Sequence, residues 1–261
     1  MNILVCIKQV PDTTEIKINP ETNTLIRQGV PSIVNPFDTY ALEMAARLKD
    51  AAGGEITVIT MGPEQAANAL RECLAAGADK AYLVNDAAFA GSDTLATSKI
   101  LAKVCEKTGP FDIIFCGKQA IDGDTGQVGP ELAEYLDMAQ ITNISELELS
   151  GAGIKGKKEF GDGYEVVEAR LPAVVTVTKT LYEPRYPTIK SKMAARRAQI
   201  DKITFADLEL EADSIGLKGS PTRVKKTFVP QAKGNGVIIQ NEPADTAARK
   251  LVALLGENKL V

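Results

Sequence analysis

The first half of the chain alternates short apolar runs with stretches in which apolar residues recur every three or four positions. The runs predict buried strands, and the recurring spacing predicts helices that cover them. The predicted strands are Asn2–Lys8, Glu55–Met61, Lys80–Val84 and Phe111–Cys116, and the predicted helices are Phe37–Lys49, Pro63–Gly77, one opening at Ser92, and Pro130–Leu136. Strands that alternate with helices predict a doubly wound, mostly parallel α/β sheet of the nucleotide-binding, flavodoxin/Rossmann-like kind.

The pattern changes near residue 140. Ile144–Leu149 and Tyr164–Ala169 flank a stretch rich in glycine and lysine, as the two strands of an antiparallel hairpin do. Ala173–Thr178 is a further apolar run and predicts one more strand.

The C-terminal end has the pattern of an arm. Pro230 and Gly234–Gly236 have the composition of a linker. Beyond them, Asn241 is placed to cap a last helix, with Pro243 in its first turn and Gly256 just past its end. The apolar stripe of this helix consists of Ala248, Leu251, Val252 and Leu255. We therefore divide the chain into a domain of residues 1–228 and an arm of residues 229–261.

Composition describes an ordinary water-soluble chain and excludes several classes of function. The 261 residues are 44% apolar and 25% charged, and the net charge of −4 gives no basic footprint for nucleic acid. No apolar run approaches the ~20 residues that a membrane span needs. The N-terminus lacks the features of a signal peptide, so we expect a cytoplasmic protein.

The chain has no histidine, which excludes a Ser-His-Asp triad, an imidazole base and a histidine-ligated metal. None of its four cysteines forms a Cys-x-x-Cys pair, so they are expected to be small buried hydrophobes. We therefore predict no catalytic side chain and no metal site. Any redox chemistry of this chain must come from a cofactor.

The segment Gly117–Gly129 is the strongest candidate site. It follows a predicted buried strand and precedes a predicted helix, which is where parallel α/β sheets bind ligands. Its glycines let the backbone approach a nucleotide, Lys118 adds a positive charge, and Asp122 and Asp124 could accept from ribose hydroxyls or adenine. A tight loop whose aspartates cap the helix would show the same pattern. The segment is neither a Walker loop nor a Rossmann fingerprint.

A second candidate, Gly91–Ser98, also follows a strand and opens a helix. Its free N–H groups and the hydroxyls of Ser92, Thr94 and Thr97 could hold a diphosphate. Ser92 acting as an ordinary helix cap explains the same residues.

Residues 179–197 carry six lysines and arginines among two prolines. A solvated loop, RNA binding through Tyr182 and Tyr186, and a docking loop for an acidic partner all fit this composition.

Taken together and in this order, several strings resemble the beta subunit of electron-transferring flavoproteins over nearly the whole chain. They are Leu4–Asp12, Asn35–Asp38, Met61–Pro63, Gly77–Asp79, Gly117–Asp122, Leu171–Thr176 and Glu183–Thr188. The resemblance implies a heterodimer with an alpha subunit that holds its own FAD, and a beta-subunit nucleotide site. The implied cofactor-binding residues are Cys6, Asn35, Pro36, Phe37, Asp38, Met61, Gly91, Ser92, Asp93, Thr94, Thr97, Gly117, Lys118, Gln119, Ala120, Ile121, Asp122, Gly123, Asp124, Thr125, Gly126, Gln127 and Val128.

Within the family, the electron-bifurcating group holds FAD in the beta site, and the housekeeping group holds AMP there. Gly91–Ser98 resembles the diphosphate segment of the bifurcating group. That resemblance implies that NADH supplies electrons to the beta-site FAD, and that ferredoxin or flavodoxin and an acyl-CoA dehydrogenase receive them.

The resemblance also implies that residues 179–197 dock the dehydrogenase, with Ile189 as an apolar anchor, and that the C-terminal helix packs on the alpha subunit. The alternatives are an AMP-binding carrier and, in another class, a non-redox nucleotide-binding module. An ATP-hydrolysing or adenylylating enzyme is disfavoured, because a Ser-Gly-Gly phosphate loop is missing.

Overall fold

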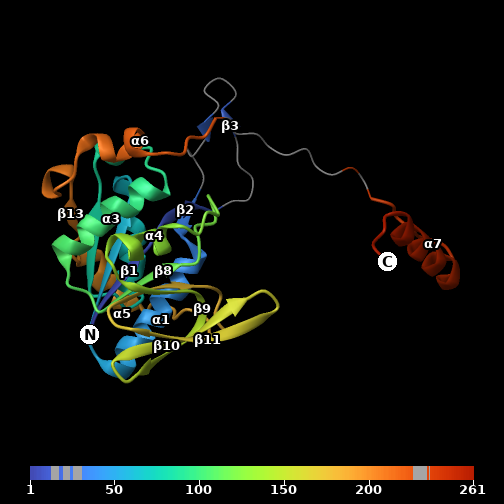
Figure 1. Cartoon of the computed structure of the whole chain (residues 1–261), viewed down its shortest axis with the longest axis horizontal. Helices are drawn as coiled ribbons and strands as arrows, with labels where there is room; N and C mark the ends of the chain where they lie inside the picture. Colours follow the sequence, from blue (N-terminus) through green and yellow to red (C-terminus); the bar gives the residue numbers. More distant parts are fainter. Residues whose placement is uncertain (13–17, 20–23, 26–30, 226–233, 235) are drawn as a thin grey trace. The chain divides into compact units, whose positions relative to one another are not determined.

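The computed structural model describes residues 1–12, 18–19, 24–25, 31–225, 234 and 236–261 (Figure 1). The chain divides into two compact units, Met1–Lys17 with Leu25–Lys225, and Ile18–Thr24 with Lys226–Val261. Of the described helices, none combines the length and the apolar character needed to cross a bilayer.

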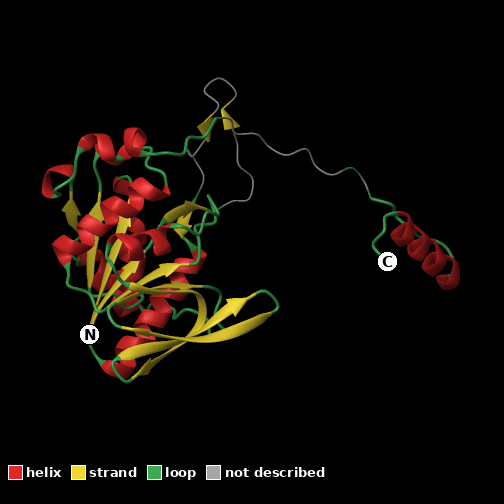
Figure 2. Cartoon of the chain, in the orientation of Figure 1, coloured by secondary structure: helices red, strands yellow, loops and turns green. Residues whose placement is uncertain are grey.

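A nine-stranded sheet forms the centre of the first unit, in the order β11-β10-β9-β12-β8-β1-β6-β7-β13 (Figures 1 and 2). Its strands are β1 (Asn2–Cys6), β6 (Glu55–Met61), β7 (Lys80–Val84), β8 (Ile113–Gly117), β9 (Ala139–Ser150), β10 (Gly153–Phe160), β11 (Gly163–Arg170), β12 (Ala173–Val177) and β13 (Asp201–Ile203). The seven strands from β9 to β13 in this order are parallel to one another. Strand β10 is antiparallel to both of its neighbours, β9 and β11. The chain runs outward through β1, β6 and β7, then returns to the other side of β1 as β8. In open α/β sheets, ligands bind at such a reversal, which here lies at the carboxyl ends of β1 and β8.

Helices cover both faces of the sheet, which confirms the doubly wound α/β prediction (Figure 2). They are α1 (Pro36–Ala52) and α2 (Ala67–Ala75) on one face, and α3 (Thr94–Thr108) and α4 (Val128–Tyr135) on the other. Neighbouring residues of β1 show the division, because side chains alternate along a strand. Ile3 lies in the core with Leu42 of α1, whereas Leu4 lies in the core with Ile100 of α3.

Shorter elements complete the first unit. They are the antiparallel pair β2 (Gln9–Pro11) and β5 (Ser32–Val34), helices α5 (Ile189–Arg197) and α6 (Gly216–Gly219), and 3-10 turns at Glu64–Ala66, Ala87–Phe89, Phe205–Asp207 and Ala212–Ser214.

In place of the predicted hairpin, β9, β10 and β11 form the antiparallel end of the nine-stranded sheet, because the glycine- and lysine-rich stretch is itself strand β10. Lys157 of this strand pairs with Glu146 of β9, at 2.9 Å between Nζ and Oε1. A Cβ on Gly156 would lie 3.1 Å from Ile144, so glycine lets β10 pass close to the core there. The two predicted strands are confirmed within β9 and β11, but the prediction that they pair directly with each other was wrong, because β10 lies between them.

The predicted loop of residues 179–197 ends in helix α5. Thr188 caps it by accepting from the Ser191 amide at 3.0 Å. The second unit contains α7 (Ala244–Glu257), β3 (Ile18–Asn19) and the first residue of β4 (Thr24–Leu25), with which β3 pairs. Pro243, not Asn241, occupies the N-cap position of α7, and Gly256 lies inside the helix rather than past its end.

The apolar stripe of α7 is partly exposed, with Leu251 at 52% and Val252 at 62%. Pro230 and Asn235 of the predicted linker lie outside the described residues.

Candidate functional site

A buried carboxylate joins three segments at the carboxyl ends of β1 and β8. Asp38, in the first turn of α1, is 5% exposed. Its Oδ2 accepts from the Lys8 amide at 2.7 Å, and its Oδ1 accepts from the Gly117 amide at 3.2 Å and from Asn35 Nδ2 at 2.9 Å. One side chain therefore holds the end of β1, the start of α1 and the end of β8 together.

The fully buried side chain of Asn35 connects the same centre to the loop of residues 117–128. Its Nδ2 donates to the Gln119 carbonyl at 2.9 Å, and its Oδ1 accepts from the Ile121 amide at 3.1 Å. Asn35 precedes α1 without capping it, because both ends of its amide reach across to the loop. Pro36 can open α1 without a cap bond from Asn35, since a proline in the first turn has no N–H to satisfy.

Burial raises the pKa of Asp38 from 3.8 to about 7, although its hydrogen bonds with Asn35, Lys8 and Gly117 and the charge of Lys8 favour the charged form. A carboxyl group with so perturbed a pKa, surrounded by converging donors, is typical of a functional site.

One ion pair and one hydrogen bond to a carboxylate cross the loop surface. Lys8 Nζ lies 2.7 Å from Asp122 Oδ1, and Gln119 Nε2 donates to Asp124 Oδ1 at 2.8 Å. The two aspartates predicted to contact a nucleotide thus have partners within the chain. Lys8 is a residue that sequence reasoning missed, and the available signal was a cation directly after the first strand.

Position 117 requires a glycine, because the first turn of α1 passes too close for a Cβ atom. A Cβ there would lie 2.2 Å from Asp38 Oδ1 and 2.9 Å from the Asp38 amide nitrogen. The loop that follows is mostly exposed, whereas Asn35 and Asp38 beneath it are buried. The backbone of this loop is therefore fixed from below and open to a ligand from above.

The segment Gly91–Ser98 has a different cap from the one predicted. Asp93, not Ser92, caps α3, because its Oδ1 accepts from the Ala96 amide at 3.1 Å. The Ser92 hydroxyl donates to the Phe89 carbonyl at 2.8 Å and accepts from the Gly216 amide at 3.1 Å. A carboxylate accepts from the helix amide more strongly than a hydroxyl, which explains why the aspartate takes the cap.

The structure brings the two candidate segments together. Thr94 Oγ1 donates to Gln127 Oε1 at 2.9 Å, and Ser98 Oγ donates to Glu131 Oε2 at 2.9 Å. The first turn of α3 and the end of the 117–128 loop therefore lie side by side at the same edge of the sheet.

The remaining predicted residues lie around this edge. Cys6 ends β1 opposite Cys116 of β8, and Met61 ends β6. All four cysteines are buried and free, as predicted. Within the described residues, no group of acidic or cysteine side chains could hold a metal ion.

A cavity of about 940 Å³ lies elsewhere, between α1, α2, α5 and the segment before α5. Leu42, Glu43, Arg71 and Arg185 are among its lining residues, and none of the predicted cofactor-binding residues is. The interpretation of a nucleotide site therefore rests on the loops at the carboxyl edge and not on this cavity.

The reversal at β1 and the two adjoining loops define a doubly wound α/β protein of the Rossmann-like kind. The family model described as "Electron transfer flavoprotein domain" matches residues 22–208. The chain belongs to the electron transfer flavoprotein family, whose beta subunits pair with an alpha subunit and take part in electron transport.

Similar proteins carry beta-subunit names. The electron transfer flavoprotein subunit beta of Thermoanaerobacterium thermosaccharolyticum is 49% identical over 262 residues, and that of Clostridium acetobutylicum is 49% identical over 261 residues. The caffeyl-CoA reductase-Etf complex subunit CarD of Acetobacterium woodii is 45% identical over 262 residues. Each alignment covers 100% of this chain and 100% of the relative.

Proposed function

We propose that this chain is the beta subunit of an electron-bifurcating flavoprotein. With its alpha subunit, it would take electrons from NADH at a FAD site on the carboxyl edge of the sheet. The electrons would divide between ferredoxin or flavodoxin and an acyl-CoA dehydrogenase. FAD, when bound, supplies all the redox chemistry, and the chain's own residues bind it, orient it and exclude water.

The observation that carries FAD over AMP is the contact between the two candidate segments. Thr94 and Gln127 join the first turn of α3 to the 117–128 loop at 2.9 Å. AMP has one phosphate, which the 117–128 loop could serve alone. A diphosphate needs donors further along, and the first turn of α3 offers N–H groups without intrahelical partners and the positive end of the helix dipole.

The residues present fit such a group. Asp38 and Asn35 hold the loop backbone in place, so its amides are arranged before a ligand arrives. Lys118 supplies a cation, and the Thr97 hydroxyl supplies a further donor. Thr94 contributes by joining the two segments, since its hydroxyl donates to Gln127. Ser92 contributes by holding the turn, since its hydroxyl donates to the Phe89 carbonyl.

The double variant Thr94→Val with Thr97→Val tests the FAD site. A hydrogen bond to a charged group is worth roughly 1.5–3 kcal/mol, so flavin should fall from near two per heterodimer towards one. NADH oxidation should fall with it. Thr108→Val, at the other end of α3, is the control: it removes a 2.7 Å hydrogen bond to the Val104 carbonyl and should cost ~1 kcal/mol of stability while leaving the flavin count unchanged. A double variant that keeps both flavins would refute the role of this turn.

A housekeeping carrier with AMP in the same site is the second candidate. It is favoured by Asp93, whose carboxylate already caps α3 where an added phosphate would approach. Nucleotide extraction from the wild-type heterodimer decides between the two, because AMP with a single flavin would exclude bifurcation.

The dehydrogenase partner is supported by residues 179–197, which we call the docking loop. Three large apolar side chains there are strongly exposed, namely Leu181 at 90%, Tyr186 at 92% and Ile189 at 82%. CarD is named as part of a complex with caffeyl-CoA reductase, which supports a partner that handles acyl-CoA. Ile189→Ala should weaken docking by ~2 kcal/mol and leave NADH oxidation by an artificial acceptor intact.

A further inference from the structure

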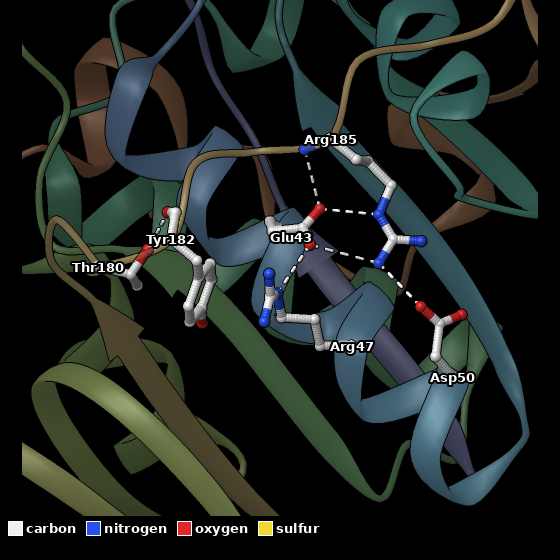
Figure 3. A network of polar contacts seen from close by, with 6 residues as sticks. All are labelled: Glu43, Arg47, Asp50, Thr180, Tyr182 and Arg185. Atoms are coloured by element: carbon white, nitrogen blue, oxygen red, sulfur yellow. Dashed lines mark hydrogen bonds and ion pairs between the residues drawn. The ribbon is translucent and has the colours of Figure 1, made fainter.

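The carboxylate of Glu43, in the middle of α1, is buried against the docking loop (Figure 3). It is 4% exposed and accepts four hydrogen bonds. Oε2 accepts from Arg185 N at 3.0 Å and Nε at 2.7 Å, and Oε1 accepts from Arg185 Nη2 at 3.3 Å and Arg47 Nε at 2.9 Å. Glu43 therefore holds both the backbone and the guanidinium of one docking-loop residue.

Two further residues of α1 extend this contact along the helix (Figure 3). Arg47, one turn on, places its guanidinium carbon 3.9 Å from the ring centroid of Tyr182. Asp50, almost a turn further, accepts from Arg185 Nη2 at 2.9 Å. The three residues form a row at spacings of four and three, which one face of a helix presents together.

The central pair is charged at physiological pH. Burial alone would raise the pKa of Glu43, but the hydrogen bonds from Arg185 and Arg47 outweigh it and hold that pKa below its usual value. The hydrogen bond to Glu43 likewise raises the pKa of Arg185. Removing Arg185 would leave the buried Glu43 carboxylate with Arg47 as its remaining partner, which costs more than losing a surface ion pair. Removing the Glu43 charge would leave Arg185, whose side chain is 35% exposed, paired with Asp50 alone.

The held segment carries the exposed apolar residues. Thr180 donates to the Tyr182 carbonyl at 2.7 Å, and Pro184 and Pro187 fix the backbone on either side of Arg185. Tyr186 directly follows Arg185 and is 92% exposed. The loop is thus tied down at its backbone while its apolar side chains remain free for a partner.

We propose that Glu43 is a positioning residue for partner docking, which pre-organises the docking loop through Arg185 so that Tyr186 and Ile189 are presented in their binding arrangement. A loop that is ordered before association does not lose its conformational freedom at the moment of binding. This inference rests on the docking function proposed above for residues 179–197.

The same helix also frames the candidate nucleotide site. Asp38 lies five positions before Glu43 on α1, about 7.5 Å along the helix axis at 1.5 Å per residue. Helix α1 therefore holds the docking loop through Glu43 and the nucleotide loop through Asp38, with separate hydrogen bonds. Replacing Glu43 should weaken docking and leave the hydrogen bonds of Asp38 intact.

Glu43→Gln in the full heterodimer tests the inference, because it keeps the side-chain size and removes the charge. We expect the Kd for the acyl-CoA dehydrogenase to rise about tenfold or more. Hydrogen exchange of residues 180–188 should become faster, while flavin content stays constant. Glu72→Gln is the matched control, since Glu72 lines the same cavity from α2 and should leave both measurements unchanged. Should Glu43→Gln fail to fold, Asp50→Asn is used in its place, because Asp50 also accepts from Arg185. It should raise the Kd and speed hydrogen exchange in the same way, by a smaller factor.

A double-mutant cycle with Ile189→Ala separates positioning from general stability. If Glu43 acts by placing Tyr186 and Ile189, the combined variant should dock less weakly than the product of the two single effects, because part of the effect of Glu43 passes through Ile189. Independent effects that multiply, or unchanged docking in Glu43→Gln, would overturn the inference. If Ile189→Ala itself leaves docking unchanged, the docking function fails, whereas unchanged exchange in Glu43→Gln would refute only the role of Glu43.

Discussion

Replacing Asp38 by asparagine should change how the stability of the protein depends on pH. In the folded chain, burial raises the pKa of this carboxyl from 3.8 to about 7. The folded state therefore holds the proton more tightly than the unfolded state does. The stability that Asp38 contributes is full below pH 3.8, and it is lost as the pH rises through 7.

The magnitude follows from the two pKa values. A group that titrates at 3.8 when unfolded and at about 7 when folded costs the protein roughly 2.5 kcal/mol of unfolding free energy between pH 5 and pH 8. The asparagine side chain would carry no charge and would lack this dependence. It would also leave one of the Lys8 and Gly117 amides without an acceptor, a penalty of about 1–3 kcal/mol that is the same at every pH.

Urea denaturation of both proteins at pH 5, 6, 7 and 8, followed by circular dichroism, measures the difference. The free energy of unfolding of Asp38→Asn should increase relative to that of the wild type as the pH rises. Thr39→Ala serves as the control, because it removes a 2.7 Å hydrogen bond to the Pro36 carbonyl on the same helix turn and carries no charge. Parallel pH profiles for wild type and Asp38→Asn would refute the raised pKa of Asp38.

Two further changes test the site and the arm. Gly117→Ala should cost about 1–3 kcal/mol and empty the nucleotide site, because its Cβ would lie 2.2 Å from Asp38 Oδ1. Gly163→Ala on β11 is the control, because its Cβ would meet only the Phe160 carbonyl oxygen at 3.9 Å, and equal nucleotide content in both variants would contradict this prediction. Deleting residues 236–261 should weaken assembly with the alpha subunit and leave the first unit folded, since the exposed Leu251 and Val252 of α7 would each gain roughly 1.5–3 kcal/mol by burial. Unchanged assembly, measured by analytical ultracentrifugation, would show that the arm does not contact the partner.

Local patterns along the chain were enough to predict the doubly wound sheet. Strands β1, β6, β7 and β8 are continuous apolar runs, because a parallel strand is buried on both faces and has no room for alternation. The strings around Gly117 and Glu183 also identified the family, which the matched family model confirmed. Each of these signals depends only on residues that are neighbours in the chain.

Strand β10 shows where local patterns fail. Its lysines and glycines have the composition of a loop, and only the neighbouring strands β9 and β11 make it a strand. The cap of α3 was misplaced by one residue for a similar reason, because the Ser92 hydroxyl is bound by Gly216, which is 124 positions away.

The roles of the charged residues became visible only in the folded chain. Lys8 reaches Asp122, and Arg185 reaches Glu43, across 114 and 142 positions of sequence. Nothing in the local pattern of α1 distinguishes Glu43, which is buried, from an ordinary surface glutamate. A charge is buried only where a partner from a distant segment satisfies it, and that partner is brought into place by the fold as a whole.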